Sequence, residues 1–411
     1  MQKRSIWLKL LGVQGAVLER VEFDGEMMRF HVRHRAGTER HCPECDRICG
    51  GYDHSDKPHT WRALDLGLAR AVVSAHLHRV NCPEHGVVLE SVPWARRGSA
   101  FTRQFEDTVT WLAVRMNKSA VAEFMRLAWR TVGSILERVC EEGRAVLDFP
   151  EVKRIGIDEV SYRKGHRYLT VVVDHDSNRL LFAHRGKSAG ALKAFFKGLG
   201  KEGCAAIELV SADGAKHWHD AVRKHCPNAR ICMDPFHVVK WATEALDEIR
   251  RQVWRAARQG DDEHAAASVK HMRWALLKNP ENLTTKQRTT LKEIEAVNKP
   301  LFRAYLLKEQ LRDVFKTGGQ RGIALLDTWI AWAETSGLNE FIGVAQSISD
   351  VRQAVDDALT SGLSNGRVES MNTRMQLLTR TAFGFHSAEA LIALAYAKFG
   401  GLCPPLPTRL S

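Results

Sequence analysis

The chain has 411 residues, of which 44% are hydrophobic and 26% charged, a globular composition that excludes wholesale disorder. Its formal net charge of +12 favours a polyanionic partner, most often nucleic acid. No run approaches the ~18 consecutive apolar residues of a membrane span and the start lacks a secretory signal, so we expect a cytoplasmic protein with no membrane partner.

Residues 1–100 predict a small strand-rich domain. Segments 18–23 and 27–34 alternate apolar and polar residues on either side of Asp24-Gly25, which is a strong hairpin signal. The nine cysteines are an odd number in a chain without a signal. They therefore indicate metal ligands or buried thiols rather than a disulfide framework.

The same domain contains two pairs of potential metal ligands with one spacing: Cys42 with Cys45, and Cys82 with His85. Two residues between ligands let both side chains of a tight turn reach one ion, so the pairs predict a closed Cys3His zinc site of structural type. Three neighbours could substitute as ligands: His41, Cys49 and His54. The alternative is a set of buried thiols beside an unrelated surface histidine.

Residues 101–150 change to helical spacing and predict a helix-turn-helix domain. The first helix would begin at Lys118 and Ser119, with Ser119 as its N-cap. The apolar residues of the two helices are Val121, Phe124 and Met125, then Ala128, Val132, Ile135, Leu136 and Val139. The second helix leaves a polar face of Arg130, Thr131, Ser134 and Arg138. A recognition helix presents such a face to a major groove, with Lys118 as a further contact, although any amphipathic helical hairpin has the same pattern.

Residues 151–239 predict strands at 153–160, 167–175, 179–186, 206–214 and 229–239, with helices at 188–200 and 216–226. Asp158 and Asp213 lie at or near the ends of the first and fourth strands. If these two strands are neighbours, both carboxylates project from adjacent strand ends.

From 240 to 360 almost every segment is helical and charged, which predicts a helical insertion with either a solvated or a phosphate-tracking surface. The last segment, 361–411, adds a helix whose polar side carries Glu369. Hard oxygen ligands of this kind hold Mg²⁺ or Mn²⁺. Two such ions ~4 Å apart can activate a water or a 3′-hydroxyl and stabilise the leaving oxygen in phosphodiester cleavage.

The order of these motifs resembles one known family. The cysteine-histidine domain and the helix-turn-helix are followed by IGIDEVS at 155–161, VSADG at 210–214, MDPFHVVK at 233–240 and SNGRVESMN at 364–372. Over nearly the whole chain this is similar to the ISL-three family of bacterial insertion-sequence DDE transposases. One departure is His85, which stands where Cys is the commoner fourth zinc ligand.

The resemblance implies a multidomain α+β fold: an N-terminal zinc-ribbon-like domain, a helix-turn-helix, and an RNase H-like α/β catalytic domain that an all-helical insertion interrupts. It implies Asp158, Asp213 and Glu369 as a catalytic triad with Mg²⁺ or Mn²⁺, beside a structural Zn²⁺. Asp234 and His237 match a D-x-x-H signature, and Asp234 is an alternative second carboxylate. Asp213 is favoured because the fourth strand lies beside the first in this fold. His237 either lies near the scissile phosphate or has a structural role.

The implied function is transposition by a nucleoid-associated homodimer. The enzyme would bind double-stranded DNA at terminal inverted repeats, cleave there and transfer 3′ ends to target DNA. Phosphate contacts would come from basic residues around the triad: Arg163, Lys164, Arg367, Arg374 and Arg380. Two alternatives stay open: an RNase H-like nuclease or resolvase without strand transfer, and a zinc and helix-turn-helix regulator with a relic catalytic domain. An intact triad argues against the regulator.

Overall fold

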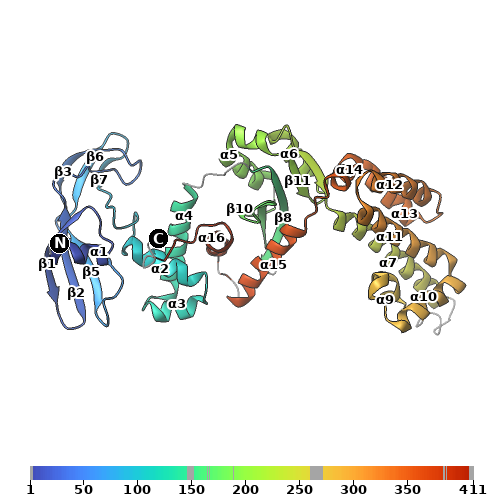
Figure 1. The fold of residues 1–411 in the computed structure, drawn as a ribbon, viewed down its shortest axis with the longest axis horizontal. Coiled ribbons are helices and arrows are strands. Elements are labelled where there is room, and N and C mark those ends of the chain that lie inside the picture. Colours follow the sequence, from blue (N-terminus) through green and yellow to red (C-terminus); the bar gives the residue numbers. More distant parts are fainter. Residues whose placement is uncertain are drawn as a thin grey trace. The chain divides into compact units, whose positions relative to one another are not determined.

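The computed structural model describes residues 3–145, 152–163, 165, 167–187, 189–259, 272–382, 385 and 387–406 (Figure 1). The chain forms two compact units, Met1–Leu147 with Leu378–Ser411, and Asp148–Leu377. The segment 361–411 is thus shared between the units, because its last residues pack with the N-terminal part of the chain. No helix in the described ranges is long and apolar enough to cross a membrane.

The first unit begins with α1 (Lys3–Leu10) and two small sheets. One sheet has the order β1-β2-β5-β4, with β1 at Ala16–Phe23, β2 at Met27–His34, β5 at Arg70–Ala75 and β4 at His59–Arg62. The other contains β3 (Gly50–His54), β6 (His78–Cys82) and β7 (Gly86–Leu89). The expected hairpin is confirmed, since β1 pairs with β2 and Asp24 Oδ1 accepts a hydrogen bond from the Met27 N–H at 2.8 Å. Gly25 has a φ of 91°, a conformation that favours glycine.

Helices complete the first unit: α2 (Arg103–Ala113), α3 (Lys118–Phe124), α4 (Trp129–Ala145) and α16 (Ala388–Phe399). The pair α3 and α4 has the helix-turn-helix connectivity that the sequence predicts. Figure 1 shows α16, from the far end of the chain, beside α4. There the Cys140 thiol donates a hydrogen bond to the Ala393 carbonyl at 3.1 Å.

Two expectations for the helix-turn-helix were wrong. Asn117, not Ser119, caps α3: its side chain accepts a hydrogen bond from the Ala120 N–H at 2.9 Å, which places Ser119 inside the first turn. Phe124 is 71% exposed and Ala128 is also exposed, although the apolar spacing predicted that both are buried. The reason is that α3 ends at Phe124, so helical periodicity does not extend through the turn.

The second unit is built on a five-stranded sheet of order β10-β9-β8-β11-β12. Its strands are β8 (Arg154–Arg163), β9 (Arg167–Asp174), β10 (Leu180–Arg185), β11 (Leu209–Ala212) and β12 (Arg230–Met233). The first three strands are antiparallel, and β11 runs parallel to both β8 and β12. The fourth strand therefore lies beside the first and the fifth at the edge, as expected for an RNase H-like core. α5 (Ala189–Ala206) and α6 (Lys216–His225) contribute Phe195 and Trp218 to the hydrophobic core.

The fifth strand is shorter than predicted. β12 ends at Met233 and Pro235 begins α7 (Pro235–Gln259), whereas the sequence predicted a strand to residue 239. Asp234 accepts a hydrogen bond from the Phe236 N–H at 3.4 Å, and proline suits a first helical position because it has no N–H to leave unpaired. The D-x-x-H signature therefore marks a strand end followed by a helix start.

Helices alone occupy the described part of the insertion after α7: α9 (Arg273–Leu277), a 3₁₀ turn (Pro280–Asn282), α10 (Thr285–Val297), α11 (Lys299–Thr317), α12 (Gly319–Glu334), α13 (Asn339–Asp350) and α14 (Arg352–Ser361). The helix α15 (Gly366–Thr381) then returns to the sheet and contacts β8. Val368, Met371 and Met375, expected to form its apolar stripe, are all buried.

Candidate catalytic and DNA-binding sites

The sheet brings the first two carboxylates of the expected triad together. The parallel pairing of β11 with β8 ends at Ser211 and Gly156, and Asp213 and Asp158 each follow two residues later, Asp213 just beyond the end of β11. Burial, together with the negative charges of Asp213 and Asp234, raises the pKa of Asp158 to about 6. The Glu159 N–H donates a hydrogen bond to Asp158 Oδ1 at 2.7 Å, which by itself would lower the pKa of Asp158. Two carboxylates so close to one another are a suitable site for a cation.

The helix α15 supplies the third group. Glu369 lies in its first turn and is exposed, and three residues later Asn372 Nδ2 donates a hydrogen bond to Asp158 Oδ2 at 2.9 Å. Within the described ranges, Asp158, Asp213 and Glu369 do not form a compact ligand cluster of the kind found in the first unit. The structure therefore places Glu369 on the helix that contacts Asp158, with its carboxylate outside a closed ligand set.

Asp234 is already fully occupied by hydrogen bonds. It is 1% exposed, its Oδ2 accepts from His237 Nδ1 at 2.8 Å, and its Oδ1 accepts from the Asn365 and Phe236 N–H groups at 3.3 and 3.4 Å. The hydrogen bond that His237 donates to Asp234 raises the pKa of His237, and the charges of Asp213 and Asp158 act in the same direction. Asp213 accepts one such bond, from the Ala215 N–H to its Oδ1 at 3.1 Å, so it has more remaining acceptor capacity than Asp234.

A buried polar chain connects the sheet to the start of α15. His175 Nε2 and Ser211 Oγ lie 2.8 Å apart, and Ser211 Oγ donates to Asn365 Oδ1 at 2.5 Å. Burial lowers the pKa of His175 to about 4, so its ring is neutral at pH 7. The chain continues through the Asn365 N–H to Asp234. Sequence reasoning missed His175, Ser211 and Asn365, although Asn365 belongs to the SNGRVESMN motif.

The basic residues expected around the triad are exposed. Arg163 ends β8, Arg367 and Arg374 lie on α15, and Arg380 lies in the part of α15 that belongs to the first unit. None of these four takes part in an ion pair with another described residue. Lys164, the fifth expected contact, lies outside the described residues.

The expected zinc ligands meet in the first unit. Cys42, Cys45, Cys82 and His85 place their ligand atoms within 4.8 Å of one another. Cys45 Sγ lies 3.7 Å from Cys82 Sγ, and His85 Nδ1 lies 3.7 and 3.5 Å from the Cys42 and Cys82 sulfurs. Ligands held ~2.3 Å from one ion in a tetrahedron lie about 3.8 Å apart, so this donor set fits Zn²⁺.

The three alternative zinc ligands have other partners. His41 Nδ1 lies 2.8 Å from the Asp46 carbonyl, Cys49 Sγ donates to the Arg47 carbonyl at 3.3 Å, and His54 packs against the His78 ring. The cluster therefore consists of the two pairs with equal spacing.

The first turns of α4 present part of the expected recognition face. Arg130 and Ser134 are exposed and Thr131 is half-buried. Arg130 and Ser134 line a hollow of about 740 Å³ whose charged lining is Arg115, Lys118, Arg130 and Lys398 against one acidic residue, Glu137. Lys118 is not a free cation, because its Nζ lies 3.5 Å above the Trp129 ring. The face is therefore basic, as a DNA-binding surface requires.

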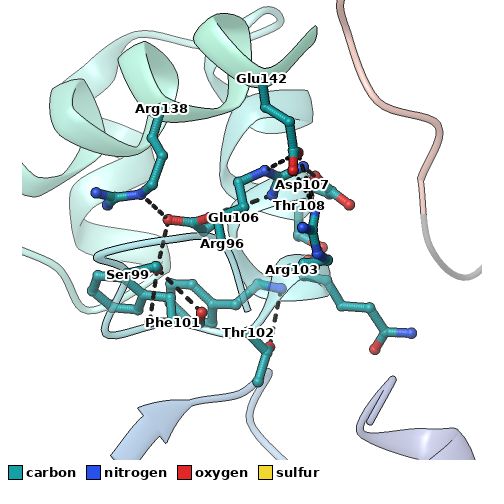
Figure 2. A network of polar contacts seen from close by, with 12 residues as sticks. Arg96, Ser99, Phe101, Thr102, Arg103, Glu106, Asp107, Thr108, Arg138 and Glu142 are labelled. Carbon is teal, nitrogen blue, oxygen red and sulfur yellow. Dashed lines mark hydrogen bonds and ion pairs between the residues drawn. The ribbon is translucent and has the colours of Figure 1, made fainter. Parts of the chain in front are cut away.

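Arg138 does not belong to this face, contrary to expectation. Figure 2 shows Arg138 reaching from α4 to Glu106 of α2, a carboxylate that is fully buried. Arg138 Nε donates to Glu106 Oε1 at 2.8 Å, and Ser99 donates to the same oxygen at 2.8 Å. Arg96 bonds Glu106, Asp107 and Glu142, so the network fixes α4 against α2. The reason for the error is that helical spacing does not show which neighbour a side chain contacts.

Comparisons with known proteins agree with this arrangement. Residues 155–395 match the transposase model of family ISL3, residues 90–140 the helix-turn-helix domain of transposase family ISL3, and residues 38–85 the zinc finger of the IS204/IS1001/IS1096/IS1165 transposases. The transposase for insertion sequence element IS1557 of Mycobacterium tuberculosis, in strains CDC 1551 and H37Rv, is 45% identical over 436 residues, covering 100% of this chain and 98% of the relative.

The transposase for insertion sequence element IS1001 of Bordetella parapertussis is 28% identical over 409 residues, covering 98% of this chain and 99% of the relative. The zinc-finger match spans the Cys3His cluster, the helix-turn-helix match spans α2 to most of α4, and the transposase match spans the sheet, the insertion and α15. The chain therefore belongs to the ISL3 family of DDE transposases.

Proposed function

We propose that this transposase binds the terminal inverted repeats of its own insertion sequence, cleaves DNA at the element ends and joins the 3′ ends to target DNA. The observation that carries the proposal is the parallel pairing of β8 with β11, which ends two residues before Asp158 and Asp213, with the Glu369 helix bonded to Asp158. Asp158, Asp213 and Glu369 are the proposed catalytic carboxylates. The proposed domains are a zinc-binding domain (1–100), a helix-turn-helix (101–150), a catalytic core (151–239 with 361–411, of which Leu378–Ser411 pack with the first unit) and a helical insertion (240–360).

The donor set fits Mg²⁺ or Mn²⁺, because Asp158, Asp213 and Glu369 all offer hard carboxylate oxygens. Bound ions of this kind activate an oxygen nucleophile and stabilise the leaving oxygen of a phosphodiester. Asp158 has to be ionised to hold a cation, and a pKa of about 6 leaves it ionised at neutral pH. His237 keeps a proton more readily than a free histidine, since its pKa is raised. We assign its free Nε2 to a phosphate oxygen near the scissile bond.

End recognition is assigned to the first unit. Arg130, Thr131 and Ser134 would contact the major groove, and Arg115, Lys118 and Lys398 in the same basic hollow would contact phosphates. The zinc cluster would hold the neighbouring domain on the DNA without taking part in chemistry. Arg163, Lys164, Arg367 and Arg374 of the second unit, and Arg380 of the first, remain proposed phosphate contacts. Bringing two element ends together makes a homodimer on the bacterial nucleoid the proposed working form.

The test is the reaction itself. Purified protein and Mg²⁺ are incubated with a labelled duplex that carries one element end and with a supercoiled target plasmid, and the products are separated on a denaturing gel. Cleavage at the element end followed by joining to the plasmid supports the proposal. Cleavage without joined product would identify a nuclease or resolvase, and binding without cleavage would identify a regulator.

Variants decide which carboxylate is second. Asp213→Ala should abolish cleavage and leave binding of the element end nearly unchanged, because this carboxylate is free to hold an ion. Asp234→Asn should retain part of the activity, because its one amide oxygen can still accept from the Asn365 N–H and its NH₂ can donate to an unprotonated His237 Nδ1. An active Asp213→Ala beside an inactive Asp234→Asn with normal folding would reverse the assignment.

A further inference from the structure

Asn372 reaches the catalytic edge from the same side of α15 as Glu369. The two residues are three positions apart on one helix, a spacing that places side chains on one face. Asn372 Nδ2 donates to Asp158 Oδ2 at 2.9 Å, so the amide group lies against the carboxylate that the sheet pairs with Asp213. The position of Asn372 is therefore set by contact with the proposed ion site.

The other half of this amide has no partner. Asn372 Oδ1 is buried, and no described residue donates a hydrogen bond to it. A buried acceptor without a donor costs ~1–3 kcal/mol, and nearly all buried polar atoms in proteins avoid that cost. This oxygen belongs to the amide that contacts Asp158, and a cation held by that carboxylate would give it a partner.

The chemistry of an amide oxygen suits that partner. Asparagine carbonyl oxygens are hard donors and serve with carboxylates as ligands of Mg²⁺, Mn²⁺ and Ca²⁺. A neutral ligand also adds coordination without adding charge at a place where Asp158 already has a raised pKa. Nδ2 faces Asp158 in this structure, so a rotation about the terminal torsion of Asn372 that exchanges Nδ2 and Oδ1 would present Oδ1 to an ion beside Asp158.

We propose that Asn372 is a metal ligand of the catalytic site and supplies its amide oxygen to the divalent ion held by Asp158. This inference rests on the proposed function, which places that ion at the carboxylates. The helix α15 then contributes two residues to the site, Glu369 and Asn372. The packing of this helix on the sheet and the binding of the ion therefore stabilise each other.

The competing explanation is that Asn372 only holds Asp158 in place through its N–H. Both explanations predict weaker ion binding in Asn372→Ala, so that variant cannot separate them. Asn372→Cys can separate the two explanations. A thiolate in a ligand position prefers Cd²⁺ to Mn²⁺, whereas a cysteine that merely lies nearby does not change the metal preference of the site. Gln376→Cys is the matched control, since Gln376 is exposed one turn further along the same helix.

The experiment measures Mn²⁺ binding to the zinc-loaded full chain by electron paramagnetic resonance, and then its displacement by Cd²⁺. We expect Asn372→Cys to lower Mn²⁺ affinity by about tenfold or more and to lower the Cd²⁺ concentration needed for displacement by a similar factor. Beyond the thiolate-to-cadmium absorption that the Cys3His cluster gives in every variant, Asn372→Cys should show an additional band that Gln376→Cys lacks. Asn372→Asp, which keeps an oxygen, should bind Mn²⁺ at least as tightly as the original protein.

The outcomes separate this inference from the proposed function. If the original protein shows no Mn²⁺ binding that depends on Asp158, the proposed ion site itself is wrong. If that binding is present but Asn372→Cys gains no preference for Cd²⁺ and no absorption band over Gln376→Cys, Asn372 is a positioning residue and the inference fails. Thermal unfolding of each variant confirms that it is folded.

Discussion

Gly156 shows how a residue without a side chain determines the catalytic edge. It lies on β8 two positions before Asp158, and a Cβ there would collide with Val368 of α15. It would also come within 2.7 Å of His175 Nε2 and 3.0 Å of Ser211 Oγ, which belong to the buried polar chain. Glycine is therefore required for the close approach of α15, not for an unusual backbone angle.

Gly156→Ala should lower the free energy of unfolding by ~1–3 kcal/mol, because an extra methyl group in a filled interior forces its neighbours apart. It should also weaken Mn²⁺ binding, because the added methyl group disturbs the packing of α15 against β8. Gly198→Ala is the control: Gly198 lies in α5 with no atom within 4 Å of a new Cβ, and alanine favours helices. Chemical denaturation of both variants checks this; equal stability would show that α15 can shift without cost.

Asp158 should make ion binding depend on pH. A proton and a cation compete for the same carboxylate, and the pKa of Asp158 in the folded protein is raised to about 6. Mn²⁺ affinity should therefore be nearly constant above that pH and fall by up to about tenfold for each pH unit below it. Titration of Mn²⁺ between pH 5 and pH 8 measures the profile. An affinity that is flat down to pH 5 would show that Asp158 does not hold the ion.

At the scale of elements, α4 uses two faces for two purposes. Its first turns expose Arg130 and Ser134 beside the basic hollow, while later turns carry Arg138 and Glu142 into the network with α2. Figure 2 shows Arg96 between Glu106, Asp107 and Glu142, so a segment that precedes α2 helps to hold α4. A buried carboxylate such as Glu106 is stable only while its cations remain, which makes the orientation of α4 depend on this network.

The two arginines of α4 should therefore behave differently when they are replaced. Arg130→Ala should leave stability unchanged and weaken DNA binding. If Arg130 contacts a base, binding to the cognate end should weaken by ~1–3 kcal/mol. If it contacts a phosphate, binding to all sequences should weaken alike, and the slope of affinity against salt should fall by about one. Arg138→Ala should cost ~1.5–3 kcal/mol of stability, because Glu106 loses a charged hydrogen-bond partner.

Binding to cognate and scrambled duplexes across a salt series, with denaturation of the free protein, measures both effects. Normal affinity and salt slope in Arg130→Ala would remove the start of α4 from the DNA-binding surface. Normal stability in Arg138→Ala would show that Arg96 and Ser99 are sufficient partners for Glu106.

At the scale of the whole molecule, the region around the zinc cluster depends on its metal. Its buried core consists of Cys42, Cys49, Val80 and Cys82, with Val88 partly buried against them. So few apolar groups cannot stabilise a folded region, whereas structural Zn²⁺ contributes about 10–16 kcal/mol of apparent binding free energy in small domains.

Removal of zinc with a strong chelator, or Cys82→Ser, should unfold this region and weaken binding to the element end. The second unit has its own large core, so its cooperative unfolding should survive. Metal analysis with calorimetry checks both parts. A purified protein without tightly bound zinc, or zinc loss with no effect on end binding, would contradict this prediction.

The sequence by itself determined the features that depend on local spacing: the Cys42–Cys45 and Cys82–His85 pairs, the Asp24-Gly25 hairpin, and the strands that carry Asp158 and Asp213. Local spacing is sufficient there because a knuckle, a turn and an alternating strand each form from neighbouring residues. Only the tertiary structure decided that Asn372 contacts Asp158 across 214 positions and that Gly156 leaves room for Val368. It also decided that Arg138 donates to Glu106 and that Leu378–Ser411 packs with the N-terminal unit. These contacts join residues far apart in the chain, and a helix pattern shows which residues share a face without showing what that face meets.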